Sequence, residues 1–250
     1  MMIDGSKCVG CSKCVTYCPI GCMSIVDKVA VIDDEACVEC GVCMRNSGCP
    51  TDAIGPSELV YPRLVRRSFS DPYARHTNTK HLHGGRGTEE IKTNDVTGVV
   101  HSLDKVEIGI EMGRPGIGAY FFDVEIICKA VAKFGVEFAH ENPLTTYMTN
   151  LETGEFDPEL LNEKVLSCII EFETDTEKLL PILDAVKEAS EKVQTVFSVC
   201  VICKVDDNNK TIVETKIAEA GYNIREASSK TNMGLGRPLY EDRIKGGEAI

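Results

Sequence analysis

The chain has 250 residues, 13 of them cysteine, and its formal net charge at pH 7 is −12. This length suits two small domains or one large domain, and the acidic balance argues against nucleic acid or an anionic membrane surface as a partner. The chain lacks an apolar stretch of membrane-spanning length and an export signal, so we expect a cytoplasmic protein in the reducing interior of an oxygen-avoiding cell.

Two cysteine runs, each closed by a proline, dominate the first fifty residues. They are Cys8–Cys11–Cys14–Cys18 before Pro19, and Cys37–Cys40–Cys43–Cys49 before Pro50. The first run has the spacing C-x2-C-x2-C-x3-C-P, in which three thiolates bind one iron–sulfur cluster and the fourth binds another. Over roughly residues 4–58 the chain resembles the bacterial two-cluster ferredoxins.

The resemblance implies two 4Fe–4S clusters whose ligands cross between the runs. Cys8, Cys11, Cys14 and Cys49 would hold one cluster, and Cys37, Cys40, Cys43 and Cys18 the other. Zinc bound by cysteine quartets is an alternative that two interleaved runs disfavour. Disulfides are disfavoured by the odd cysteine count and the expected reducing compartment.

The second run departs from the family spacing. Five residues separate Cys43 from Cys49 instead of three, and the excess falls within Arg45–Gly48. We expect these residues to loop out as a bulge and to leave Cys49 a ligand. A three-iron or labile cluster at Cys8, Cys11, Cys14 and Cys49 is the alternative.

We expect residues 1–58 to form a ferredoxin domain in which Ile3 and residues 29–32 are short strands. A turn of helix is expected after each Cys-Pro. Cys22 lies four residues after Cys18, and we interpret it as a small buried hydrophobic residue rather than a ligand.

Residues 59–104 form a connecting segment with no hydrophobic period. Its composition is rich in Gly, Thr, Asn and His, and its first part is locally basic. A passive linker would have a simpler composition, so we expect an ordered loop system rather than a tether.

From residue 105 to 250 the pattern is regular and predicts an α+β domain. The expected elements are a strand over 106–112, a turn over 113–118, a helix over 123–134, a strand over 136–138 that resumes at 145–148, a short helix over 157–163, a strand over 165–172, a helix over 179–186, a strand over 193–205, a helix over 211–220 and a strand over 222–225. The order βαββαβ with an appended αβ predicts a two-layer α/β sandwich of the ferredoxin-like or ACT-like kind. Cys128, Cys168, Cys200 and Cys203 are expected in its core.

Two glycine-rich turns, 112–118 and 231–238, both contain Gly-Arg-Pro. Glycines allow close backbone approach to a ligand, and arginine offers a fork for carboxylate or phosphate. We therefore hypothesise a small anionic ligand in a shared cleft. The candidate ligand-binding residues are His76, His81, His83, Arg86, Thr93, Asn94, Arg114, Asn232 and Arg237. A metal site on the three histidines lacks a fourth ligand and is disfavoured.

The leading functional hypothesis is an iron–sulfur electron-transfer protein that relays electrons through two 4Fe–4S clusters to a partner oxidoreductase. The chain also resembles a group of anaerobe proteins that join such a domain to a long C-terminal domain. One alternative is an oxidoreductase enzyme or subunit with its own anion-binding site in the C-terminal part. Another is an ACT-like metabolite-sensing or docking module, which would form homo-oligomers through that domain. The sequence leaves open whether the protein is an enzyme, and it names no substrate or redox partner.

Overall fold

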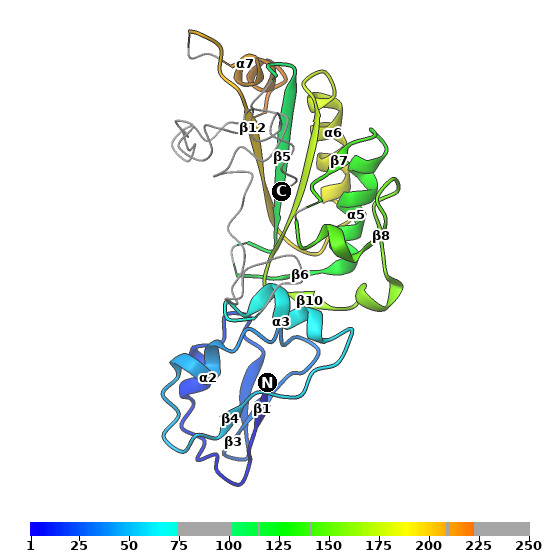
Figure 1. Ribbon diagram of the computed structural model, residues 1–250. Coiled ribbons are helices and arrows are strands. Elements are labelled where there is room, and N and C mark those ends of the chain that lie inside the picture. Colours follow the sequence, from blue (N-terminus) through cyan, green and yellow to red (C-terminus); the bar gives the residue numbers. More distant parts are fainter. Residues whose placement is uncertain (75–101, 115, 141, 209–210, 223–250) are drawn as a thin grey trace, which may run out of the picture.

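The computed structural model describes residues 1–74, 102–114, 116–140, 142–208 and 211–222, and its content is mixed α and β. In Figure 1 the N-terminal unit, residues 1–58, lies at the lower end. The C-terminal unit, from residue 102 onward, lies above it, and helix α3 (Leu64–Ser70) lies between the two. The predicted strand over 222–225 lies almost entirely outside the described residues.

The N-terminal unit contains two short antiparallel pairs and two short helices. β1 (Met2–Ile3) pairs with β4 (Ile54–Gly55), and β2 (Met23–Val26) pairs with β3 (Val29–Ile32). Its helices, α1 (Lys13–Thr16) and α2 (Val42–Asn46), lie between the second and fourth cysteines of each run, where they carry Cys14 and Cys43. The expectation of helix after each Cys-Pro was therefore wrong. Proline disfavours helical backbone at the residue before it, so each helix ends before the last cysteine of its run.

Helix α3 was not predicted, because seven residues are too few to show a helical period. Its Val65 and Phe69 are buried in the core of the C-terminal unit. The Phe69 ring meets Phe121 with centroids 5.9 Å apart and Tyr147 with centroids 5.8 Å apart. The start of the predicted connecting segment thus packs as part of the C-terminal core.

The C-terminal unit is built on a four-stranded antiparallel sheet in the order β12–β5–β11–β7. The strands are β5 (Lys105–Met112), β7 (Glu137–Phe138), β11 (Cys168–Asp175) and β12 (Phe197–Cys203). Helices α5 (Phe121–Ala132) and α6 (Leu179–Ser190) cover one face of this sheet (Figure 1). The apolar alternation of β5 places Val106, Ile108, Ile110 and Met112 fully buried on the covered face.

Smaller elements complete the C-terminal unit. These are β6 (Ala119–Tyr120), η2 (Thr145–Tyr147), β8 (Met148–Asn150), β9 (Glu155–Phe156), η3 (Pro158–Leu160), β10 (Lys164–Val165) and α7 (Ile212–Glu219). β6 pairs with β10, and β8 pairs with β9.

Several sequence-based bounds need correction. The helix expected over 157–163 is only the 3-10 turn η3, which Asp157 caps by accepting a hydrogen bond from the Glu159 amide. The strand expected to resume at 145–148 begins as η2, and the strand expected over 193–205 covers only β12. Cys128 and Cys168 are buried as expected, whereas Cys200 is half-buried and its thiol faces Glu111.

Candidate metal centres

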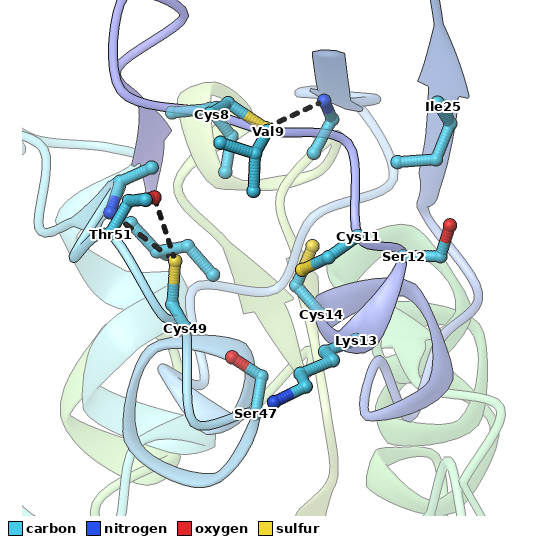
Figure 2. A pocket seen from close by; sticks show the side chains of 14 residues that line it. Cys8, Val9, Cys11, Ser12, Lys13, Cys14, Ile25, Ser47, Cys49 and Thr51 are labelled. Carbon is cyan, nitrogen blue, oxygen red and sulfur yellow. Dashed lines mark hydrogen bonds between the residues drawn. The ribbon is translucent and has the colours of Figure 1, made fainter. Parts of the chain in front are cut away.

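A pocket in the N-terminal unit, here called the first pocket, collects Cys8, Cys11, Cys14 and Cys49. Figure 2 shows the Cys8 sulfur above the central space, the Cys49 sulfur to its left and the sulfurs of Cys11 and Cys14 to its right. The remaining lining is largely apolar, from Ile3, Val9, Ile25, Ala30, Ala53 and Ile54. The local backbone requires glycine at position 10, where φ is +66° and a Cβ would lie 2.5 Å from the Lys28 carbonyl oxygen.

A second pocket collects Cys18, Cys37, Cys40 and Cys43. Its apolar lining comes from Met1, Ile20, Met23, Ile32 and Val38, and it also contains Cys22. In each cysteine run the first three thiols line one pocket, and the fourth lines the other. The structure thus gathers the eight cysteines into the two sets that the resemblance implies.

Backbone amides point at several of these sulfurs. The amides of Ala30, Cys22 and Ala53 donate to the sulfurs of Cys8, Cys18 and Cys49, each at 3.3 Å. The last two bonds are equivalent, since each joins the fourth cysteine of a run to the amide four residues later. Hydrogen bonds of this kind favour the thiolate, which is the form that binds metal.

The pKa values of the thiols follow burial and hydrogen bonding. Burial raises the pKa of Cys14 and of Cys40, and it raises that of Cys43 to about 11. Amide donors, that of Thr51 first, lower the pKa of Cys49. Thiols must lose their protons to bind metal, so assembly at the second pocket would release protons from Cys40 and Cys43, which hold them tightly.

Cys22 is closer to the second pocket than the sequence suggested. Its sulfur lies 3.4 Å from that of Cys18. Hydrogen bonding with the Cys18 and Cys37 side chains raises the pKa of Cys22, and the same bonds lower the pKa of Cys18 and of Cys37. Cys22 therefore lies in hydrogen-bond contact with predicted ligands of the second pocket, and in its pair with Cys18 either thiol can be the donor. In the second run, Ala53 takes the equivalent place four residues after Cys49.

Buried charges flank the second pocket. Glu39, between Cys37 and Cys40, is fully buried and accepts hydrogen bonds from the Met1 ammonium group and from Arg63. Arg66, 5% exposed, donates to the carbonyl oxygens of Glu35 and Cys37 at 2.7 and 2.8 Å. Arg66 also pairs with Glu163 of the C-terminal unit. Sequence reasoning missed these residues, because nothing in the pattern distinguishes a buried charge from a solvated one.

The excess residues of the second run do not loop out as expected. Arg45 and Asn46 belong to α2, so only Ser47 and Gly48 lie between this helix and Cys49. The Arg45 guanidinium donates to the Cys40 carbonyl, forms an ion pair with Asp71 at 3.1 Å, and lies over the Tyr73 ring. These contacts fix Arg45 in place, and Gly48 turns the chain at φ +57°.

The hypothesised anion site lies mostly outside the described residues: His76, His81, His83, Arg86, Thr93, Asn94, Asn232 and Arg237 all do. Arg114 is described, and its guanidinium contacts the Ser167 hydroxyl at 3.4 Å and the Glu111 carboxylate at 3.6 Å. The hypothesis that the other candidates share a cleft with Arg114 therefore stays a prediction.

The donor sets and the pockets fit iron–sulfur clusters. In each pocket four thiols from both runs line one partly open, largely apolar space, and a cluster of several metal and sulfide ions needs ligands held apart in this way. Among the described residues, no three His, Cys, Asp or Glu side chains converge closely enough to hold a single metal ion.

Comparison with known proteins gives one match. The family model of the 4Fe-4S binding domain matches residues 1–24, which include the first cysteine run. No curated protein and no solved structure matches the chain. Within the described residues, none of the helices has the length and apolar character needed to cross a membrane. The N-terminal region thus carries a domain that binds a 4Fe–4S cluster.

Proposed function

We propose that this protein is an electron-transfer protein that holds two 4Fe–4S clusters and relays electrons through them to a partner oxidoreductase. Cys8, Cys11, Cys14 and Cys49 hold the first cluster, and Cys18, Cys37, Cys40 and Cys43 hold the second. The observation that supports this most strongly is the pair of pockets, each lined by four thiols drawn from both runs. When bound, each cluster supplies one-electron redox chemistry.

The chain's own residues set the environment of this chemistry. The apolar linings of both pockets limit water, and the amides of Ala30, Cys22 and Ala53 stabilise negative charge on the ligand sulfurs. Because each run contributes to both pockets, the two sites are necessarily close together. Short separation suits transfer from one cluster to the other.

The two sites differ in what surrounds them, which gives the relay a direction. The second site adjoins the C-terminal unit: Arg66 links the Cys37 carbonyl to Glu163, and a Cβ at Gly118 would lie 3.5 Å from Ile20. At the first site Cys11 is exposed, and Val9 is 61% exposed. An external redox partner therefore meets the first cluster, and the second cluster lies next to the C-terminal unit.

We infer that the C-terminal unit is a ferredoxin-like or ACT-like sandwich, from its βαββαβ order and its strand order β12–β5–β11–β7. No observation on the described residues favours catalysis or metabolite sensing by this unit over docking. Arg114, the one described candidate for anion binding, already contacts Ser167 and Glu111.

Anaerobic isolation followed by iron and sulfide analysis tests the proposal. We expect about eight iron and eight sulfide ions per chain, four of each for each cluster. The reduced protein should then return electrons to a one-electron acceptor dye. Zinc in place of iron, or iron and sulfide for a single cluster only, would contradict the two-cluster assignment.

A further inference from the structure

Ser47 is a buried side chain of the first pocket with no partner for its hydroxyl. It is the C-cap residue of α2 and is 5% exposed. Its Oγ makes no hydrogen bond to any described residue, although the residue lines the first pocket together with Cys49. Figure 2 shows Ser47 beside Cys49, on the edge of the central space.

The other polar side chains of this pocket have partners. The Ser12 hydroxyl is exposed and donates to the Gly10 carbonyl at 3.5 Å, and Lys13 Nζ donates to the Gly48 carbonyl at 3.5 Å. The Thr51 hydroxyl lies 3.8 Å from the Cys49 sulfur. A buried hydroxyl that gave up water without gaining an acceptor would destabilise the fold. The pocket that Ser47 lines would supply that acceptor once it holds sulfide and thiolate.

We propose that the Ser47 hydroxyl donates a hydrogen bond to a sulfur of the first cluster and raises the reduction potential of that cluster alone. This inference rests on the proposed function. On reduction the cluster accepts one electron from an external reductant, and no covalent bond forms or breaks. The reduced cluster carries one more negative charge, so a donor stabilises it more than the oxidised cluster.

The second pocket has no hydroxyl at the equivalent position, and the extra polar side chain beside its ligands is the Cys22 thiol. The residue at the C-cap of α1, Tyr17, is 48% exposed and is not among the residues that line the second pocket. Ser47 is one of the residues that make the spacing between Cys43 and Cys49 longer than in the family. The longer spacing therefore brings a hydroxyl to the first cluster only. The two clusters would thereby differ in potential although their ligands are the same.

The test is a potentiometric titration followed by electron paramagnetic resonance on Ser47→Ala, with Ser47→Thr and Tyr17→Phe as controls. Loss of one hydrogen-bond donor should lower the ratio of reduced to oxidised first cluster about threefold to tenfold at a fixed ambient potential. This corresponds to a potential lower by about 30–60 mV, at 59 mV per tenfold for one electron. Ser47→Thr keeps the hydroxyl and should stay near the wild-type potential, and Tyr17→Phe should leave both potentials unchanged.

The outcomes separate this inference from the proposed function. A Ser47→Ala protein with full iron and unchanged potentials would overturn the role of Ser47 and leave the two-cluster proposal standing. Absence of iron from the wild type would overturn the proposed function itself. Should the alanine variant fail to hold the first cluster, Ser47→Gly also removes the hydroxyl, and glycine tolerates the right-handed helical backbone of this position, where φ is −72° and ψ is −17°. The potential must fall in that variant too, and an unchanged value would again reject the inference.

Discussion

Individual buried charges hold the second site in place. Burial alone would raise the pKa of Glu39, but the hydrogen bonds from the Met1 ammonium group and Arg63 outweigh it, and the pKa lies below its usual value. Arg66 is a buried cation that is surrounded by acceptors, as Glu39 is a buried anion surrounded by donors. Its guanidinium pairs with the Glu163 carboxylate and donates to backbone carbonyls in and next to the second cysteine run. Charges buried in this way stabilise a structure only while every partner is present.

Replacing Arg66 by methionine should therefore be costly. The change leaves Glu163, whose side chain is 13% exposed, without its cation, and the Cys37 carbonyl without its donor. We expect a loss of about 3–5 kcal/mol in the free energy of unfolding, measured by circular dichroism in urea under anaerobic conditions. Arg67→Met is the matched control, since Arg67 donates a single bond, at 3.3 Å, to the Ser57 carbonyl. Equal stability of the two variants would show that the Arg66 network is not important.

For individual residues, the sequence predicted a role only where the spacing of the cysteines is characteristic of cluster binding. The spacing of Cys8, Cys11 and Cys14 and the family resemblance together implied ligand sets that match the two pockets. Cys22 was interpreted as an inert core residue because its distance to Cys18 and Cys37 depends on how the chain turns at Gly21, where φ is +72°. Ser47 looked like a loop residue, since burial of a small polar side chain leaves no mark in a sequence.

Among the secondary-structure elements, α2 absorbs one of the two extra residues of the second run. It has five residues where α1 has four, and Ser47 and Gly48 complete the connection to Cys49. Deleting Ser47 and Gly48 restores three residues between Cys43 and Cys49. Because Arg45 is fixed independently by Cys40 and Asp71, we expect near-normal iron content and a lower potential of the first cluster. Iron analysis and potentiometry check this, and loss of the first cluster would show that the two residues are needed for its geometry.

Tyr222, which follows helix α7, forms a hydrogen bond to Asp184 of α6. This bond should break at alkaline pH, when the Tyr222 hydroxyl loses its proton. The Tyr222 hydroxyl donates to the Asp184 carboxylate at 2.5 Å, and burial together with this bond raises the pKa of Tyr222 to about 12 from 10.0. A raised pKa means that the stabilisation is complete below about pH 10 and is lost as the pH rises through about 12. Wild type should thus be more stable than Tyr222→Phe below pH 10, with the difference vanishing above 12.

Ultraviolet absorbance of tyrosinate provides the direct measurement for this bond. The wild type should show a phenolate that appears near pH 12, and the Tyr222→Phe protein should lack it. Asp184→Asn is the complementary variant, because it keeps the phenol and removes the carboxylate. A titration of Tyr222 that is the same with and without Asp184 would contradict the assignment.

Across the whole molecule, hydrophobic periodicity predicted the long elements and failed for the short ones. β5, α5, β11 and α6 each have a continuous apolar face, and all four were expected near their observed positions. Helix α3 was missed because its two turns bury only Val65 and Phe69 among the apolar residues, and tertiary packing rather than local pattern stabilises it. The 3-10 turns η2 and η3 were taken for a strand and a helix, since so few residues carry no distinctive period.

The central claim is that two clusters are held by ligand sets that cross between the cysteine runs. The most direct test compares the paramagnetic resonance spectra of dithionite-reduced Cys49→Ser, Cys11→Ser and Cys40→Ser proteins. Crossed sets predict that Cys49→Ser alters the same cluster as Cys11→Ser, with the other cluster keeping its wild-type signal. If Cys49→Ser instead altered the cluster affected by Cys40→Ser, each run would serve its own cluster, and the account would be wrong.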